Sequence, residues 1–263
     1  MSSTIAKILP TPSQTSGIGF LNPGLLPDFR TSLRNLHLMR RDPIYSGWNR
    51  KTLSQVPILN NGADFRATEV YSATRGTFIE IDDIPVNYQT GFTFAMALRW
   101  DTFPQSGEPI IESKDNSFSP NRGFTLRSTG AASPSVVWRC GTAGGRGMVN
   151  RSIPDMPTAN YSWWFISFDR DDVRVLLAHS DSVAVSDVNF DSSAGFEDPD
   201  PEAGFRFFQG SVPQSSVDDP DTAGMAAFAY WDEGLDIGQM RDEYANLKSW
   251  SASVGIDLTP ETF

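Results

Sequence analysis

The stretch of this chain whose residue types and spacing come nearest to a catalytic pattern is Glu80-Ile81-Asp82. Side chains alternate between the two faces of a β-strand, so Glu80 and Asp82 share one face and the neighbouring isoleucines share the other. A strand of the pattern E-I-D-x-E can present the nucleophile and the acid/base of a retaining glycosidase, whose carboxyl groups lie about 5–5.5 Å apart. Here Ile84 stands at the position of the second glutamate, and Pro85 follows. We therefore predict no catalytic role, and we expect this acidic face to be the solvated face of an edge strand.

Tryptophans in predicted strands are the candidates for sugar binding, because aromatic rings stack on sugar C–H surfaces while polar groups fix the hydroxyls. The candidates are Trp138, Trp163, Trp164 and Trp231. Trp163 and Trp164 are adjacent, so at least one of them must point away from the core of the domain. That ring is then a glycan platform, a contact between subunits, or a surface that the N-terminal part of the chain covers.

An acidic loop, Val217-Asp218-Asp219-Pro220-Asp221, is the candidate metal site. Calcium takes several oxygen ligands, which Asp218, Asp219 and Asp221 can supply, although the spacing matches no EF-hand loop. The alternative is a solvated loop tip. We predict no other cofactor.

Nucleophilic catalysis finds little support in the sequence. The chain has two histidines and one cysteine, Cys140, which we expect to be buried and inert. No serine sits in a G-x-S-x-G elbow. We therefore predict that the protein is not an enzyme.

Composition excludes several classes of partner. The 263 residues carry a formal net charge of −11, which disfavours nucleic acid and anionic membranes. No apolar run approaches the roughly 20 residues that a membrane-spanning helix needs, and the N-terminus has no apolar segment typical of a signal peptide. A single cysteine excludes an internal disulfide, and the 18 Phe and 7 Trp indicate a large aromatic core.

Residues 1–66 differ in composition from residues 67–263. Prolines and glycines recur through them, which predicts an extended arm rather than a regular sheet. The spacing of apolar residues predicts one short helix from Phe29 to Arg40, with Asp28 as its N-cap. Positive charge is concentrated at Arg30, Arg34, Arg40 and Arg41. Phe29 and these arginines would dock the arm on a neighbouring subunit; the alternative is that the segment packs on its own domain.

From residue 67 onward the sequence predicts strands joined by turns, and one late helix. The predicted strands are Phe78–Ile81, Phe92–Trp100, Pro109–Ser113, Gly123–Arg127, Ser135–Cys140, Met148–Ile153, Trp163–Asp169, Val173–His179, Ser182–Val188, Gly204–Gln209 and Ala226–Trp231. Alternation places Phe92, Phe94, Met96, Leu98 and Trp100 on one face of their strand. The helix runs from Ile237 to Lys248, with Asp236 as its N-cap. Many short strands of this kind indicate an all-β, two-sheet antiparallel sandwich.

In their order and spacing, these segments resemble the laminin-G-like, concanavalin A-like lectin jelly roll over roughly residues 67 to 250. The segments that carry the resemblance are Phe78–Asp83, Gly91–Trp100, Gly123–Leu126, Trp163–Asp169 and Ala226–Tyr244. The chain departs from the family's pattern at Ala178–Ser182, where an Asn-Gly turn is usual. The resemblance implies two packed antiparallel sheets; members bind glycans, proteins or calcium, and some relatives are glycosidases, so the fold does not settle the function.

A lectin-like sandwich with a basic arm and no catalytic set is similar to virion proteins of bacteriophages. We therefore expect a structural protein of a virus particle (tail, fibre or head decoration) that is a homo-oligomer, contacts other virion subunits and exposes its jelly roll to host cell-surface glycans. The alternatives are a carbohydrate-binding module or glycosidase, and a calcium-dependent adhesin. We expect no nucleic acid partner and no membrane insertion.

Overall fold

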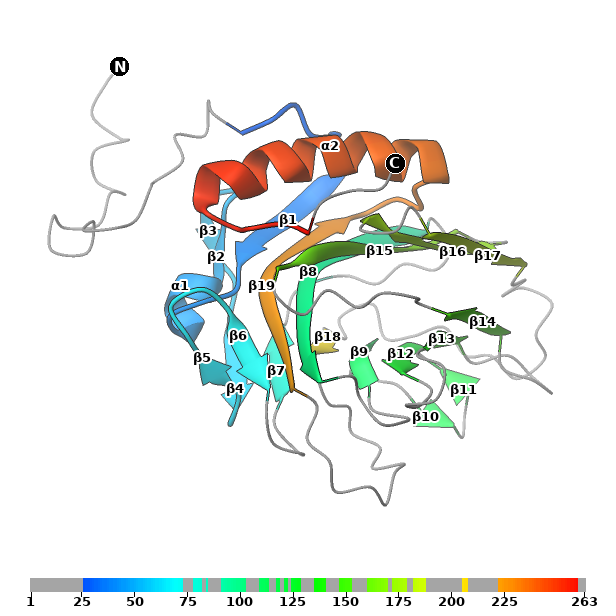
Figure 1. The fold of residues 1–263 in the computed structure, drawn as a ribbon, viewed down its shortest axis with the longest axis horizontal. Helices are drawn as coiled ribbons and strands as arrows, with labels where there is room; N and C mark the ends of the chain where they lie inside the picture. The colour runs from blue at the N-terminus through cyan, green and yellow to red at the C-terminus, as the bar shows by residue number, and fades with distance from the viewer. Residues whose placement is uncertain are drawn as a thin grey trace, which may run out of the picture.

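The structure, a computed structural model, describes residues 26–72, 78–81, 84, 91–102, 109–113, 117–118, 121–122, 124–128, 135–140, 147–152, 160–169, 172–178, 182–187, 205–207 and 222–259. Strands dominate these residues, and two sheets face each other with one long helix covering the outer side of the first sheet (Figure 1).

The first sheet holds the long central strands of the molecule. Its strands, in spatial order, are β17 (Ser182–Asp187), β16 (Asp172–Leu177), β15 (Ser162–Phe168), β8 (Phe92–Thr102), β19 (Thr222–Trp231), β6 (Val70–Ser72) and β5 (Asp64–Phe65), and β1 (Leu33–Leu38) also pairs with β19. Each of these pairings is antiparallel.

The second sheet is built from shorter strands. Their order is β14 (Gly147–Ser152), β13 (Ser135–Cys140), β12 (Phe124–Ser128), β9 (Pro109–Ser113), β18 (Phe205–Phe207), β7 (Phe78–Ile81) and β4 (Ile58–Asn61), again antiparallel throughout. Two small ribbons lie outside the sheets: β2 (Trp48–Asn49) with β3 (Ser54–Gln55), and β10 (Ser117–Phe118) with β11 (Asn121–Arg122).

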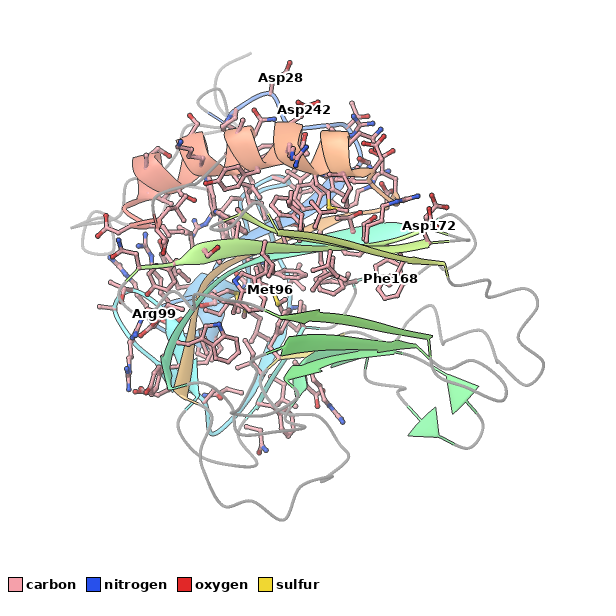
Figure 2. All side chains as sticks on the ribbon, turned by 45° about the vertical axis from the view of Figure 1, so that its right-hand side comes forward. Asp28, Met96, Arg99, Phe168, Asp172 and Asp242 are labelled. Carbon is pink, nitrogen blue, oxygen red and sulfur yellow. The ribbon has the colours of Figure 1, made fainter. Side chains whose placement is uncertain are left out.

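Alternation along β8 divides the core into two layers. Phe92, Phe94, Met96, Leu98 and Trp100 are buried between the two sheets, as predicted. Figure 2 shows Met96 and Phe168 pointing into this space. The alanines between them, Ala95 and Ala97, face the opposite layer, between the first sheet and the long helix. Small residues there allow the helix to approach the sheet closely.

The long helix, α2 (Ile237–Val254), begins at the predicted N-cap. The side chain of Asp236 accepts a hydrogen bond from the Gln239 N–H, and the Gln239 side chain accepts one from the Asp236 N–H, which completes a capping box. The helix ends at Gly255, whose φ of 73° is the left-handed conformation that glycine adopts at low cost. Its buried residues include the predicted Met240, Tyr244 and Leu247, and also Trp250.

The predicted helix from Phe29 to Arg40 is wrong, because residues 33–38 form strand β1. This strand pairs with residues 227–231 of β19, and its residues are buried except at position 34. The short helix of this region is instead α1 (Pro43–Ser46), capped by Asp42. Residues 58–61 and 64–65 supply β4 and β5, so residues 26–66 are part of the sandwich and not a separate arm.

All the strands predicted after residue 77 are present. Phe78–Ile81, Pro109–Ser113 and Ser135–Cys140 match the observed bounds, and the others differ at their ends. The predicted all-β, two-sheet antiparallel fold is confirmed.

No helix among the described residues is long and apolar enough to cross a membrane.

Candidate functional site

The predicted sugar-binding tryptophans Trp163, Trp164 and Trp231 are each 0% exposed. A ring can stack on a sugar only where its face is open to the ligand, so the prediction is wrong for these three residues. Trp163 and Trp164 point to opposite faces of the first sheet, but both faces are buried, so the prediction that one ring points away from the core is wrong. Trp164 lies between the sheets, 5.8 Å from Trp100 between ring centroids. The fourth candidate, Trp138, pairs in β13 with Leu126 and Val149, and its side chain lies outside the described residues.

Helix α2 covers Trp163, an arrangement that the sequence did not indicate. Trp163 Nε1 donates to Ser251 Oγ at 3.0 Å, and its ring lies 6.5 Å from that of Trp250. Trp231 Nε1 donates to the helix residue Glu243 at 3.1 Å. The two tryptophans therefore hold the helix on the sheet.

Glu80 is buried and paired, so the expected solvated edge-strand face is also wrong. β7 lies between β18 and β4 and is not an edge strand. The Glu80 side chain is 6% exposed, and its Oε1 accepts from Arg206 Nε at 2.7 Å. Arg206 stands opposite Glu80 on the neighbouring strand β18, so the ion pair joins the two strands.

A second buried carboxylate, Glu69, is held even more completely. Arg99 donates to both of its oxygens, at 2.8 and 2.5 Å, and Tyr161 Oη donates to Oε2 at 2.9 Å. Burial and then the Glu69 charge raise the pKa of Tyr161 to about 12. A Cβ on Gly224 would lie 1.7 Å from Glu69 Oε2, so the carboxylate fits only because this residue is glycine. These contacts tie residues 69, 99 and 161 into one rigid unit.

Three of the residues expected to dock on a neighbouring subunit, Phe29, Arg30 and Arg34, instead hold the N-terminal segment on its own domain. Phe29 is buried under α2. Arg30 Nε donates to Glu233 at 2.7 Å, and Arg34 Nε donates to Asp232 at 2.5 Å. This outcome is the alternative that the sequence left open, in which the segment packs on its own domain.

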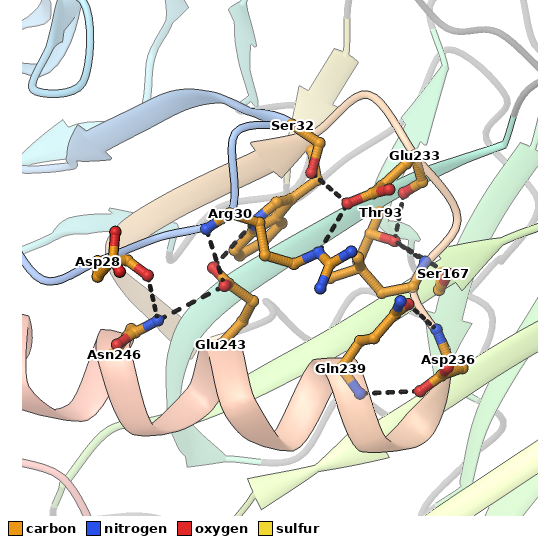
Figure 3. A network of polar contacts seen from close by, with 12 residues as sticks. Asp28, Arg30, Ser32, Thr93, Ser167, Glu233, Asp236, Gln239, Glu243 and Asn246 are labelled. Carbon is orange, nitrogen blue, oxygen red and sulfur yellow. Dashed lines mark hydrogen bonds and ion pairs between the residues drawn. The ribbon is translucent and has the colours of Figure 1, made fainter.

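Figure 3 shows how the segment is joined to the strand–helix connection. The backbone N–H of Arg30 donates to Glu243 at 3.0 Å, and Ser32 donates to Glu233. Burial opposes ionisation of Glu233, but the hydrogen bonds from Arg30 and Ser32 hold its pKa below the usual range. Burial raises the pKa of Glu243, against the effect of its hydrogen bonds. Thr93 links this network to the sheet: its hydroxyl donates to the Glu233 carbonyl at 2.8 Å, and its Oγ1 lies 2.9 Å from Ser167 Oγ.

The predicted calcium ligands Asp218, Asp219 and Asp221 lie outside the described residues, and a calcium site there stays a prediction. Within the described part of the chain, no group of three or more His, Cys, Asp or Glu side chains is arranged to hold a metal ion.

The surface feature that remains is the α1–β3 unit, residues 43–55, which lies under the C-terminal end of α2 (Figure 1). Among the tryptophans whose side chains are described, Trp48 alone is not buried. Ile44 is 78% exposed and Leu53 is 39% exposed. Aromatic and apolar side chains at the surface of one small unit are typical of a binding surface. Sequence reasoning missed Trp48, although its polar surroundings (Ser-Gly-Trp-Asn-Arg) were a usable signal.

The α1–β3 unit is held rigidly on β1. Asn49 is buried; its Oδ1 accepts from the Leu36 N–H at 3.2 Å, and its Nδ2 donates to the Arg34 carbonyl at 2.8 Å. His37 Nδ1 lies 2.9 Å from the Ser46 carbonyl and donates to it. A Cβ on Gly47 would lie 2.3 Å from the Val56 carbonyl oxygen, so the close turn of the unit also requires a glycine. A surface fixed in this way can present Trp48 without a large ordering cost on binding.

Comparison with known proteins supports the fold. No family model matches the chain, and no curated protein matches it. One similar structure is of botulinum neurotoxin type C, whose cell entry depends on interaction with two ganglioside molecules. It aligns with a TM-score of 0.56 at 12% identity, over 82% of this chain and 51% of that chain.

Two further structures resemble this chain to a similar degree. The binding domain of botulinum neurotoxin DC in complex with SialylT aligns with a TM-score of 0.55 at 12% identity, over 82% of this chain and 52% of that one. The same binding domain in complex with rat synaptotagmin II aligns with a TM-score of 0.53 at 12% identity, over 84% and 51%. This chain spans about half the length of each. At these identities the likeness shows a jelly-roll, lectin-like β-sandwich and no more.

Proposed function

We propose that this chain is a non-enzymatic recognition module that binds a glycan through the α1–β3 unit. The observation that carries the proposal is the position of Trp48. It is half-buried on the small unit that also carries the exposed Ile44, while the other tryptophans whose side chains are described are enclosed in the core. The similar solved structures, which include a SialylT complex, support a binding role for the fold.

A binding role also agrees with the state of the buried carboxylates. The buried acidic residues of the described structure are Glu69, Glu80 and Glu243. Arginines hold the first two, and the third accepts hydrogen bonds from Trp231 and the Arg30 backbone. Each of these carboxylates is held by contacts within the scaffold.

The test is a glycan array with the purified chain and a Trp48→Ala variant. We expect the wild type to bind a defined set of glycans and the variant to lose about tenfold or more in affinity, because loss of a stacked ring removes on the order of 1–2 kcal/mol. Leu59→Ala is the matched control: Leu59 is 55% exposed on β4, outside the α1–β3 unit, and its removal should change nothing. Unchanged binding by Trp48→Ala, or no glycan bound by the wild type, would contradict the proposal.

The second candidate function is assembly into a virus particle. The sequence feature that favours it is the set of prolines at positions 10, 12 and 23, ahead of the docked segment. Because Phe29, β1 and β4 belong to the sandwich, the test must remove residues 1–25 and leave the rest of the chain intact. We expect this truncation to fold normally and to fail to enter particles. Normal incorporation of the truncated chain would argue against this function.

A further inference from the structure

The α1–β3 unit carries a concentration of positive charge around one aromatic ring. The guanidinium carbons of Arg40, Arg41 and Arg50 lie 5.8, 5.1 and 4.6 Å from the centroid of the Tyr45 ring. Arg40 and Arg41 follow β1, and Arg50 follows β2, so the pairing of this small unit with β1 brings the three cations together. Three positive charges gathered around one ring repel one another. The attraction between the guanidinium groups and the Tyr45 ring offsets only part of that cost.

Arg50 has only part of the hydrogen bonding that a buried cation needs. It is 9% exposed, and its Nε and Nη2 are buried without a hydrogen-bond acceptor. Arg40 Nε is in the same state, although Arg40 Nη1 donates to the Val254 carbonyl at 3.3 Å and Nη2 to Tyr45 Oη at 3.4 Å. Burial lowers the pKa of Arg50; the Tyr45 hydroxyl opposes this, and the charges of Arg40 and Arg41 lower it further. A buried donor without an acceptor destabilises a fold by about 1–3 kcal/mol, and by more when it is charged.

Elsewhere in the described structure, six arginines are paired with carboxylates. The pairs involve Arg30, Arg34, Arg66, Arg99, Arg174 and Arg206. Within the described residues, Arg40 and Arg50 have no such pair. The acidic residue next to them in sequence, Asp42, accepts the Tyr45 N–H at 2.7 Å and caps α1. A chain with a net charge of −11 has carboxylates in excess, yet Arg40 and Arg50 pair with none of those that the structure describes.

The backbone of Arg41 adds an independent observation. Its φ is 70°, a left-handed conformation that is uncommon for a residue with a long side chain. Such conformations persist where the surrounding structure enforces them, and they are frequent at binding sites. The conformation places an exposed arginine beside the ring of Tyr45.

We infer that Arg40, Arg41 and Arg50 form a binding site for an oxyanion, the carboxylate or sulfate group of an acidic glycan, next to Trp48. The inference rests on the proposed function, and it adds that the glycan carries a negative charge. Arg41 is exposed and Arg40 is half-buried, so these two reach the anion, and the planar guanidinium groups suit a carboxylate or sulfate. Arg50 lies beneath them and adds its charge, which the bound anion neutralises.

The first experiment compares three forms of one oligosaccharide, neutral, carboxylated and sulfated, by titration calorimetry. We expect the wild type to bind an acidic form about tenfold or more tightly than the neutral form, with the preference reduced at 0.5 M salt. The carboxylated and sulfated arms show which anion fits. Arg41→Gln should reduce the preference for the acidic form, because it removes one of the two guanidinium groups that reach the anion. Glutamine at this position adopts the same left-handed backbone conformation, so the substitution changes the charge and leaves the backbone strain as it is. Arg241→Gln, at an exposed arginine on α2, is the matched control and should behave as the wild type.

The outcomes separate the two proposals. Equal affinity for neutral and acidic forms would overturn the oxyanion site and leave glycan recognition standing. If no oligosaccharide binds, glycan recognition fails, and the site is tested alone by the thermal shift that sodium sulfate produces relative to sodium chloride at equal ionic strength. A larger shift for the wild type than for Arg41→Gln supports the site, since general salting effects are common to both. An identical shift overturns it.

Discussion

The ring of His37 should make the stability of this protein depend on pH in the mildly acidic range. His37 lies in β1, completely buried beneath the α1–β3 unit, and its pKa is lowered from 6.5 to about 4. Burial is the main cause; the hydrogen bond to the Ser46 carbonyl opposes the shift, and the charge of Arg50 adds to it. The folded protein therefore keeps this ring neutral at pH values where the unfolded chain protonates it.

The sign and size of the change in stability follow from the pKa of His37 in the unfolded chain, 6.5, and in the folded protein, about 4. Between pH 6.5 and 4 the unfolded state binds more protons, so stability falls as the pH falls through this window and is unaffected above it. One pKa unit corresponds to about 1.4 kcal/mol, so the full loss approaches about 3 kcal/mol, of which about 2 kcal/mol is reached by pH 5.

The assay is urea denaturation followed by tryptophan fluorescence, at several pH values from 7.5 to 4.5, for the wild type and His37→Asn. Asparagine can keep the hydrogen bond to the Ser46 carbonyl, because its amide nitrogen occupies the place of Nδ1, but it does not titrate. Carboxylates and the second histidine titrate equally in both proteins, so the difference between the two curves isolates His37. We expect the wild type to lose about 2 kcal/mol more than the variant between pH 7.5 and pH 5. Parallel curves would refute the reasoning.

Three further substitutions test the scaffold, each by chemical denaturation. Gly224→Ala should lower the free energy of unfolding by about 3 kcal/mol or more, because the new Cβ displaces the Glu69 carboxylate from its partners; a loss below 1 kcal/mol would mean that the carboxylate can move cheaply. Trp163→Ala should lower the free energy of unfolding by about 3–5 kcal/mol, because it opens a cavity under α2, and Trp163→Phe should retain most of the stability. If Trp163→Ala costs no more than a substitution at the surface, the burial of this ring is contradicted. Asp236→Ala should cost about 1 kcal/mol and increase hydrogen exchange in the first turn of α2 only; unchanged exchange would show that the capping box does not hold that turn.

Local patterns predicted most of the sandwich because they report on burial directly. The alternating Phe92 to Trp100 segment gave the strand and the face that is buried, since a period of two allows only one arrangement over a sheet. Asp236 and the apolar residues spaced along α2 predicted the helix and its start for the same reason.

The segment around β1 shows where such patterns fail. Phe29, Leu33 and Leu36 have helical spacing, but the free edge of β19 supplies backbone partners for residues 33–38, and burial on both faces removes any alternation. The prediction for Glu80 fails in a different way. Alternation placed it correctly on the face opposite Ile79 and Ile81, but that face is buried, and the arginine that pairs with Glu80 lies 126 positions along the chain. Strand order and the partners of a buried charge are decided by contacts between distant segments, which local sequence does not encode.

Short-range patterns are enough to specify a two-sheet β-sandwich with one C-terminal helix, because side-chain periodicity, turn residues and a helix cap act over a few neighbouring positions. Which side chains stay at the surface depends on the tertiary structure. The helix packs over Trp163 and Trp231 and removes them from the surface, whereas pairing of the α1–β3 unit with β1 leaves Trp48 partly open and gathers Arg40, Arg41 and Arg50 around Tyr45. Exposure and charge clustering depend on how the elements pack against one another, and that packing is settled only when the whole chain folds.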